Sequence, residues 1–179
     1  YSENRVNTVT AGDQDFSTIA TLSNGDMVVA YRSGTSVMMQ RYDSNGVAQG
    51  AETTLTTSTL TDWKGEVIAI EPLSNGKFAI AWAEDVSSTV DTKFEIFNAD
   101  GSSYAGPTVL NQITGNTQTL VDLTATADGG FIGTWESDVD AHWQIKAIKV
   151  SDSGTVGTEF FVEESTEWDY SPQIELLPN

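Results

Sequence analysis

The segment LSNGKFAIAW, from Leu73 to Trp82, occurs three times in this chain with small changes. The first copy, LSNGDMVVAY, runs from Leu22 to Tyr31, and the third, TADGGFIGTW, runs from Thr126 to Trp135. A spacing of about fifty residues between copies is typical of a repeat protein whose units bury their cores against one another. The first question about function is therefore which face of the array binds a ligand.

A second marker follows each copy. YDSNG ends at Gly46, FNADG at Gly101 and VSDSG at Gly154. Asn-Gly and Asp-Gly pairs are strong hairpin signals because tight turns need a positive φ. Each repeat is therefore predicted as four short antiparallel strands, which in the first repeat cover about residues 16–22, 27–32, 36–42 and 52–57.

The polarity of these strands indicates the architecture. The second strand of the first repeat is apolar on both faces, as expected for a strand inside a sandwiched sheet. The fourth strand is mostly polar and suits an outer edge. We therefore predict an all-β, β-propeller-like array of four-stranded antiparallel blades, with Tyr31, Trp82 and Trp135 in the core. The competing interpretation, a two-sheet sandwich, requires alternation in every strand.

The predicted boundaries leave partial blades at both ends. They are an outer strand in residues 1–11, blades in 12–60, 61–115 and 116–166, and the first strand of a truncated blade in 167–179. Val6, Leu55, Leu110 and Val162 are expected at equivalent inward positions of the fourth strands. Three complete blades are too few for a closed ring of 4–8 blades, so we expect a fragment of a longer chain or half of an oligomeric ring.

The composition excludes several classes of function. The 26 acidic and 8 basic residues give a net charge of -18, which disfavours binding to nucleic acid or to anionic membranes. No apolar run is long enough to span a bilayer, so membrane insertion is not expected. With no cysteine and a single histidine, His142, disulfides, thiolate sites and multi-histidine metal sites are excluded. The acidic balance favours solubility, cation binding or salty surroundings.

Strand order places the variable connections together. The loops after the second and fourth strands lie at one end of the blades and carry aspartates and tryptophans. Trp63 and Trp168 occupy nearly the same phase of the repeat, and with Trp143 they are candidates for an aromatic platform that binds a sugar or a peptide. The alternative role for Trp63 and Trp168 is packing between neighbouring blades.

The same loops contain a candidate metal site. Glu136, Asp138 and Asp140 cluster their carboxylates as hard cations require, so they are the candidate ligands for calcium. The alternative is three solvated acids in a polar loop. His142 could act as a general base, but the sequence indicates no partner or nucleophile for it.

The LSNGD segment, followed by QRYDSNG from Gln40 to Gly46, resembles repeats of very large secreted bacterial proteins. These are calcium-dependent RTX-type adhesins and hemolysin-like surface proteins. The resemblance implies export from a Gram-negative bacterium and an extracellular or cell-surface location. It brings no catalytic residue, and the glycine-aspartate nonapeptide of the RTX calcium roll does not occur in this chain.

These observations predict an extracellular, non-enzymatic repeat segment of a bacterial adhesin or surface protein, which binds a ligand or displays other parts. Its expected partners are a glycan or protein on a surface, and the remaining blades of the same protein or an identical chain. Calcium is the one cofactor expected. The alternative is a fragment of a secreted propeller hydrolase that acts on glycans or peptides and whose catalytic residues lie outside this chain. A third interpretation is a spacer without any ligand.

Overall fold

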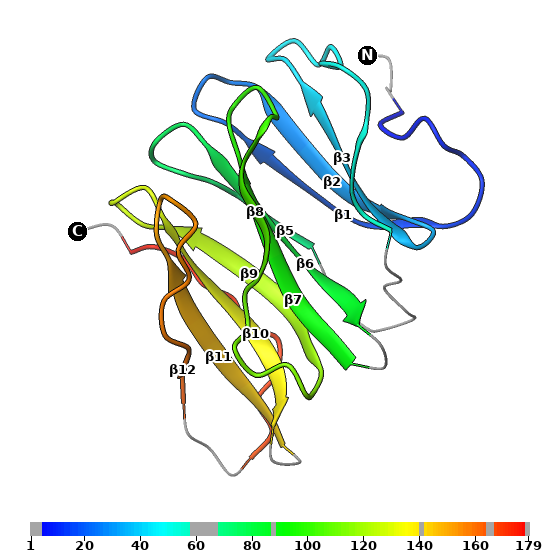
Figure 1. Cartoon of the computed structure of the whole chain (residues 1–179). Coiled ribbons are helices and arrows are strands. Elements are labelled where there is room, and N and C mark those ends of the chain that lie inside the picture. The colour runs from blue at the N-terminus through cyan, green and yellow to red at the C-terminus, as the bar shows by residue number, and fades with distance from the viewer. Residues whose placement is uncertain (1–4, 58–67, 87–88, 140–141, 164–166, 178–179) are drawn as a thin grey trace.

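The computed structural model describes residues 5–57, 68–86, 89–139, 142–163 and 167–177. These residues form twelve strands in three antiparallel sheets and contain no helix (Figure 1). The described part of the chain accordingly offers no helix that could cross a membrane. The prediction of an all-β chain built from four-stranded antiparallel sheets is confirmed.

Each sheet is a simple meander in which consecutive strands are neighbours. The first sheet contains β1 (Gln14–Thr21), β2 (Met27–Ser33), β3 (Ser36–Tyr42) and β4 (Thr53–Thr56). The second contains β5 (Ile68–Pro72), β6 (Phe78–Val86), β7 (Thr89–Phe97) and β8 (Ser103–Val109). The third contains β9 (Gln118–Ala125), β10 (Phe131–Val139), β11 (His142–Val150) and β12 (Phe160–Phe161).

The repeated glycines make the tight turns between the first and second strands. Gly25, Gly76 and Gly129 have φ values of 86°, 81° and 88°, a region that side chains other than glycine rarely adopt. In each turn the glycine N–H donates to the carbonyl oxygen three residues earlier. The markers read from the sequence therefore fix where the strands begin and end.

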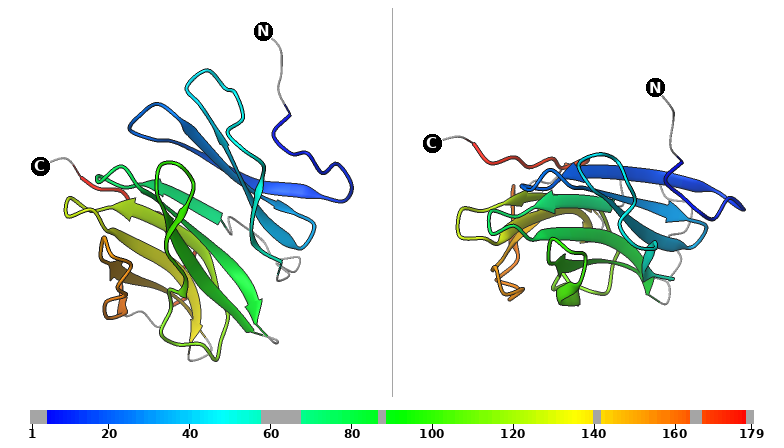
Figure 2. Two further views of the ribbon diagram at one scale, coloured as in Figure 1. Left: turned by 45° about the horizontal axis from the view of Figure 1, so that its top comes forward. Right: turned by 90° about the horizontal axis from the view of Figure 1, so that it is seen from above.

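The three sheets lie side by side in chain order, and their first strands are neighbours: β1 contacts β5, and β5 contacts β9 (Figures 1 and 2). One hydrophobic core lies between the first and second sheets and a second core between the second and third. β6 contributes to both cores, since Phe78 and Ile80 belong to the first, and Ala79 and Ala81 to the second. A strand apolar on both faces is thus buried on both faces, as the sequence predicts.

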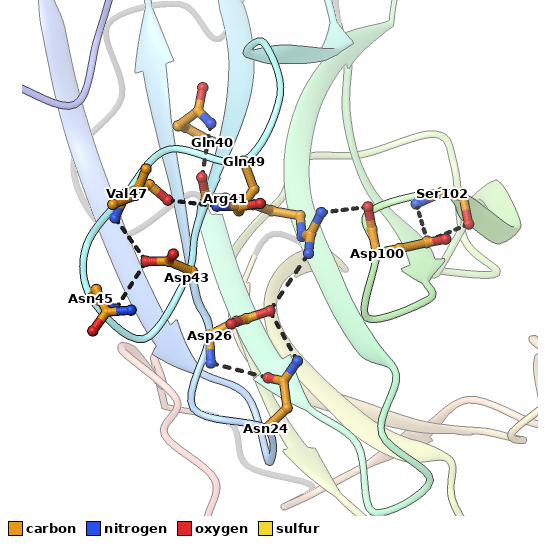
Figure 3. Close-up of polar contacts among 10 residues, drawn as sticks. All are labelled: Asn24, Asp26, Gln40, Arg41, Asp43, Asn45, Val47, Gln49, Asp100 and Ser102. Atoms are coloured by element: carbon orange, nitrogen blue, oxygen red, sulfur yellow. Dashed lines mark hydrogen bonds and ion pairs between the residues drawn. The ribbon is translucent and has the colours of Figure 1, made fainter.

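Arg41 connects the first sheet to the second. From β3 its Nη1 donates to the carbonyl oxygen of Asp100 in the turn between β7 and β8, and its Nη2 lies 3.7 Å from Oδ2 of Asp26 (Figure 3). A Cβ on the turn residue Gly101 would lie 2.7 Å from Cδ of Arg41. Glycine at this turn therefore serves both the positive φ and the close approach of the neighbouring sheet.

A carboxylate clasp also joins neighbouring units. Glu52 accepts from the backbone N–H of Thr8 at 2.7 Å and from its hydroxyl at 2.6 Å. In the same way Glu159 accepts from the backbone N–H of Gln112 at 2.7 Å. In both clasps the carboxylate stands near the start of a fourth strand. Gln112 follows β8, the fourth strand of the preceding sheet, and Thr8 belongs to the segment before β1. The same acceptor position therefore binds an earlier segment of the chain in both places.

The four inward positions predicted on the fourth strands differ in depth. Leu110 is fully buried, Leu55 and Val6 are half-buried, and Val162 is 59% exposed. Leu110 is buried because the third sheet covers it, with Gly133 leaving room for its side chain. Val162 follows β12 on the outer side of the third sheet, where no further described strand covers it. The depth of such a residue therefore depends on the neighbouring sheet.

Candidate functional site

The best candidate site lies at the end of the third sheet where β10 and β11 meet. The segment 167–171 crosses this end and is tied to both strands. The backbone N–H of Asp169 donates to the carbonyl oxygen of Trp143 at 2.9 Å, and the N–H of Ser171 donates to Oε1 of Glu136. Loops predicted from strand order to share one end are therefore brought together here.

Two aromatic rings are exposed on this segment. Trp168 and Tyr170 are 57% and 53% exposed, and their ring centroids are 6.1 Å apart at an interplanar angle of 59°. Large aromatic side chains are usually buried, and exposed pairs of this kind offer an apolar face with polar groups at its edge. The exposure of Trp168 favours the platform role over the packing role. Trp143 is half-buried at the start of β11, and Trp63 lies outside the described residues.

Two acidic residues, Glu136 and Asp169, belong to the same end of the sheet. Glu136 is buried on β10, and burial raises the pKa of its carboxyl group. Asp169 lies between the two rings in sequence, and its Oδ2 is shielded from water without a hydrogen-bond partner among the described residues. An unpaired, desolvated carboxylate oxygen is costly, which points to a buried water as its donor.

Two of the three predicted calcium ligands, Glu136 and Asp138, lie among the described residues. Asp138 is half-buried, and its backbone N–H donates to the carbonyl oxygen of Thr117 at 2.9 Å. The carboxylate of Glu136 points toward the N–H of Ser171, and Asp140 lies outside the described residues. Within the described ranges no group of three or more histidine and acidic side chains is placed to hold a metal ion. Calcium binding at this end stays a prediction.

Two fully buried polar side chains of the same sheet were not predicted from the sequence. Gln118 on β9 and Ser137 on β10 are direct cross-strand partners. Oε1 of Gln118 accepts from the indole N–H of Trp135 at 2.8 Å, but its Nε2 and the Oγ of Ser137 have no partner among the described residues. Such orphan groups are rare and point to a buried water. In the sequence they look like ordinary polar strand residues, so no local signal could find them.

A groove also lies where the first strands of the three sheets converge. It has a volume of about 380 Å³ and is lined by three residues of each of β1 and β5 and by Val121 and Asp122 of β9. Phe16, at its wall, has a φ of 50°, and the guanidinium carbon of Arg32 lies 4.7 Å from its ring centroid. Burial and the nearby Asp122 raise the pKa of Glu71 beside this groove, while an N–H bond from Ala125 opposes the shift. The groove is therefore a second candidate site, separate from the aromatic end.

No family model and no curated protein matches this chain. Among solved structures it is similar to a polysaccharide lyase of family PL25, an ulvan lyase, with a TM-score of 0.53. It is also similar to a structure of a PL25 ulvan lyase bound to -[GlcA(1-4)Rha3S]-, with a TM-score of 0.55. Both are 11% identical to this chain, and each match covers 85% of this chain and 44% of the lyase.

This likeness concerns the fold, and it corrects one expectation. The sequence was interpreted as non-enzymatic because no acid–base constellation could be identified in it. That interpretation is contradicted by the likeness, since the chain shares its fold with polysaccharide lyases. The chain spans less than half the length of those enzymes, so more than half of each lyase has no counterpart in this chain.

Proposed function

We propose that this chain is part of a polysaccharide-cleaving enzyme and that its three sheets are consecutive blades of a β-propeller. The adjacency of the first strands β1, β5 and β9 supports the propeller arrangement, because first strands surround the axis of such a fold. The fold likeness to lyases supports a glycan as substrate. This proposed function replaces the adhesin interpretation. The extracellular location remains part of the proposal because polysaccharide substrates of this kind occur outside the cell.

The single observation that carries the sugar-binding role is the exposed pair of Trp168 and Tyr170, which flank Asp169 in the sequence. The apolar face of a sugar ring stacks on an aromatic ring, and its hydroxyl groups donate to carboxylates. The carboxylates and the net charge of -18 favour a neutral sugar unit at this subsite, or an acidic unit bridged by a cation.

The proposal is tested with binding assays on soluble polysaccharides, one neutral and one rich in uronic acid, using calorimetry or affinity electrophoresis. Trp168→Ala and Tyr170→Ala should each weaken binding, and the double variant should lose about tenfold in affinity. Tyr104→Ala is the control, since Tyr104 is another exposed aromatic residue, 45% exposed on the second sheet, with Lys77 over its ring. If Trp168→Ala lowers stability without weakening binding, Trp168 is a packing residue and the platform is wrong.

The reaction class is tested on the same polysaccharides. Elimination produces an unsaturated sugar that absorbs ultraviolet light, whereas hydrolysis produces reducing ends without that absorbance. A lyase-like enzyme gives both signals together. Reducing ends alone would assign the protein to hydrolysis, and the absence of both signals, with binding intact, would contradict the enzymatic part of the proposal.

A further inference from the structure

A large cavity lies on the outer side of the first sheet. It has a volume of about 560 Å³ and separates the segment 5–8 from β3 and the turn that follows it. Its lining residues are Arg5, Val6, Thr8, Met38, Gln40, Tyr42, Gly46, Ala48, Gly50, Ala51 and Glu52.

Several polar groups of this lining are already engaged within the chain. Glu52 accepts from Thr8 and from the hydroxyl of Tyr31, so both of its oxygens are paired. The amide nitrogen of Gln40 donates to the carbonyl oxygen of Arg41 at 2.9 Å, which turns it toward its own sheet. Because these groups of Glu52 and Gln40 are already paired, they offer little to a sugar, and an apolar occupant would not break their bonds.

The same place between the second and third sheets is filled. The clasp of Glu159 with Gln112 corresponds to that of Glu52 with Thr8, and the isolated bridge of Val150 with Val156 corresponds to that of Tyr42 with Ala48. At the filled joint, Phe94 and Ile96 of β7 pack in one core with Ile148 and Val150 of β11.

The surroundings of the turn glycines also differ between the filled joints and the open side of the first sheet. A Cβ on Gly101 would lie 2.7 Å from Arg41 of the preceding sheet, and one on Gly154 would lie 2.8 Å from Ala105 and 3.8 Å from Ile96. Gly46 holds the equivalent position in the first sheet, and a Cβ there meets nothing within 4 Å. The outer side of the first sheet therefore has the same contact surface as the second and third sheets, but no strand of the described residues covers it.

We propose that the cavity is the seat of a further four-stranded sheet of the same repeat. Its third strand places apolar side chains, equivalent to Phe94 and Ile96, against Gln40, Tyr42 and Gly46, and residues 5–8 follow its outermost strand as Leu110 and Gln112 follow β8. The inference rests on the propeller arrangement proposed above and is independent of sugar binding.

The test extends the chain by one repeat. A copy of residues 61–112 replaces residues 1–8, so that the copied Leu110 and Gln112 stand in for Val6 and Thr8. We expect a monomer whose melting midpoint is about 5–10 °C higher and whose amides in β3 exchange more slowly with deuterium, because the cavity wall becomes buried. Changing the copied Phe94 and Ile96 to Asp should abolish both gains.

Gly46→Ala provides a matched comparison. In the original chain it costs only the strain of a positive φ, whereas in the extended chain the added Cβ also meets the new strand. The loss in melting midpoint should therefore be larger in the extended chain. Equal losses in both chains, or an added repeat whose amides stay unprotected, would overturn the proposal. Saturable sugar binding lost on Tyr42→Ala would likewise assign the cavity to a glycan instead. None of these outcomes depends on the platform at Trp168.

Discussion

A buried ion pair on the third sheet gives the sharpest prediction about stability. Nζ of Lys146 lies 2.6 Å from Oε1 of Glu159 and 4.4 Å from the ring centroid of Phe161. The side chains of the pair are 2% and 7% exposed. Two opposite charges this deeply buried stabilise each other, but each is costly without its partner.

Lys146→Met keeps the length of the side chain and leaves the carboxylate of Glu159 buried without its cation. Removing one partner of a buried pair costs about 3–5 kcal/mol. For a chain of this size each kcal/mol lowers the melting midpoint by about 2–4 °C, so the expected loss is about 6–20 °C. The double variant Lys146→Met with Glu159→Gln should recover most of it, because the amide oxygen can still accept from the N–H of Gln112.

The assay is thermal unfolding followed by circular dichroism and calorimetry. Lys149→Met on the same strand is the matched control, since its ion pair with Asp128 is exposed on both sides and exposed pairs contribute little. Equal losses from the two lysine variants would show that burial does not set the energy of the pair. A double variant as unstable as Lys146→Met would show that packing, rather than the orphaned charge, causes the loss.

Three further predictions concern charge and close packing. Because the net charge is -18, the melting midpoint should rise when salt screens the repulsion, which unfolding in low and high NaCl measures. Burial raises the pKa of Glu136 in the folded chain, so ionisation of this carboxyl group costs stability as the pH rises. Glu136→Gln should therefore raise the melting midpoint near pH 7 and have little effect on it below about pH 4. Melting curves recorded over a series of pH values test this. Gly130→Ala should be severely destabilising because the added Cβ would lie 2.2 Å from the backbone carbonyl oxygen of Val150. Gly133→Ala should cost less stability because its Cβ meets the movable ends of two leucine side chains, one of them Leu110. Comparing the melting midpoints of the two variants tests this order.

Much of the fold could be predicted from the sequence because its signals are local. The third strand of the first repeat was expected at residues 36–42, and β3 runs from Ser36 to Tyr42. The Asn-Gly turns fix the ends of such strands, and the burial of Tyr31, Trp82 and Trp135 follows from apolar residues on both strand faces. These features need no knowledge of distant parts of the chain.

The candidate site could be predicted only in part, because it depends on pairing between distant segments. Trp168 and Trp143 were assigned to one end of the blades from strand order, and the bond from Asp169 to Trp143 is consistent with that assignment. The orphan groups of Gln118 and Ser137 arise from cross-strand register, and the left-handed φ of Phe16 from an irregularity between Asp15 and Thr18. Neither feature can be predicted from residue type or from spacing in the sequence.

The interpretation of the chain as non-enzymatic was wrong for a related reason. Absence of a recognisable acid–base set in one segment says little when an enzyme can draw its reacting groups from several blades. At 11% identity the likeness to lyases is carried by strand order and sheet packing, which are visible only in three dimensions.

The carboxylate clasps have a consequence for how such a chain can change in evolution. Glu52 of the first repeat and Glu159 of the third each supply the acceptor of such a joint. The second repeat has Pro107 at the corresponding position, three residues before Leu110, and offers no carboxylate there. A duplication of a period that carries the glutamate would therefore bring the same joint to the new neighbours, whereas a copy that carries Pro107 would not. Recombination can change the number of repeats with a ready-made interface when it copies the glutamate, while selection acts on the loops at one end.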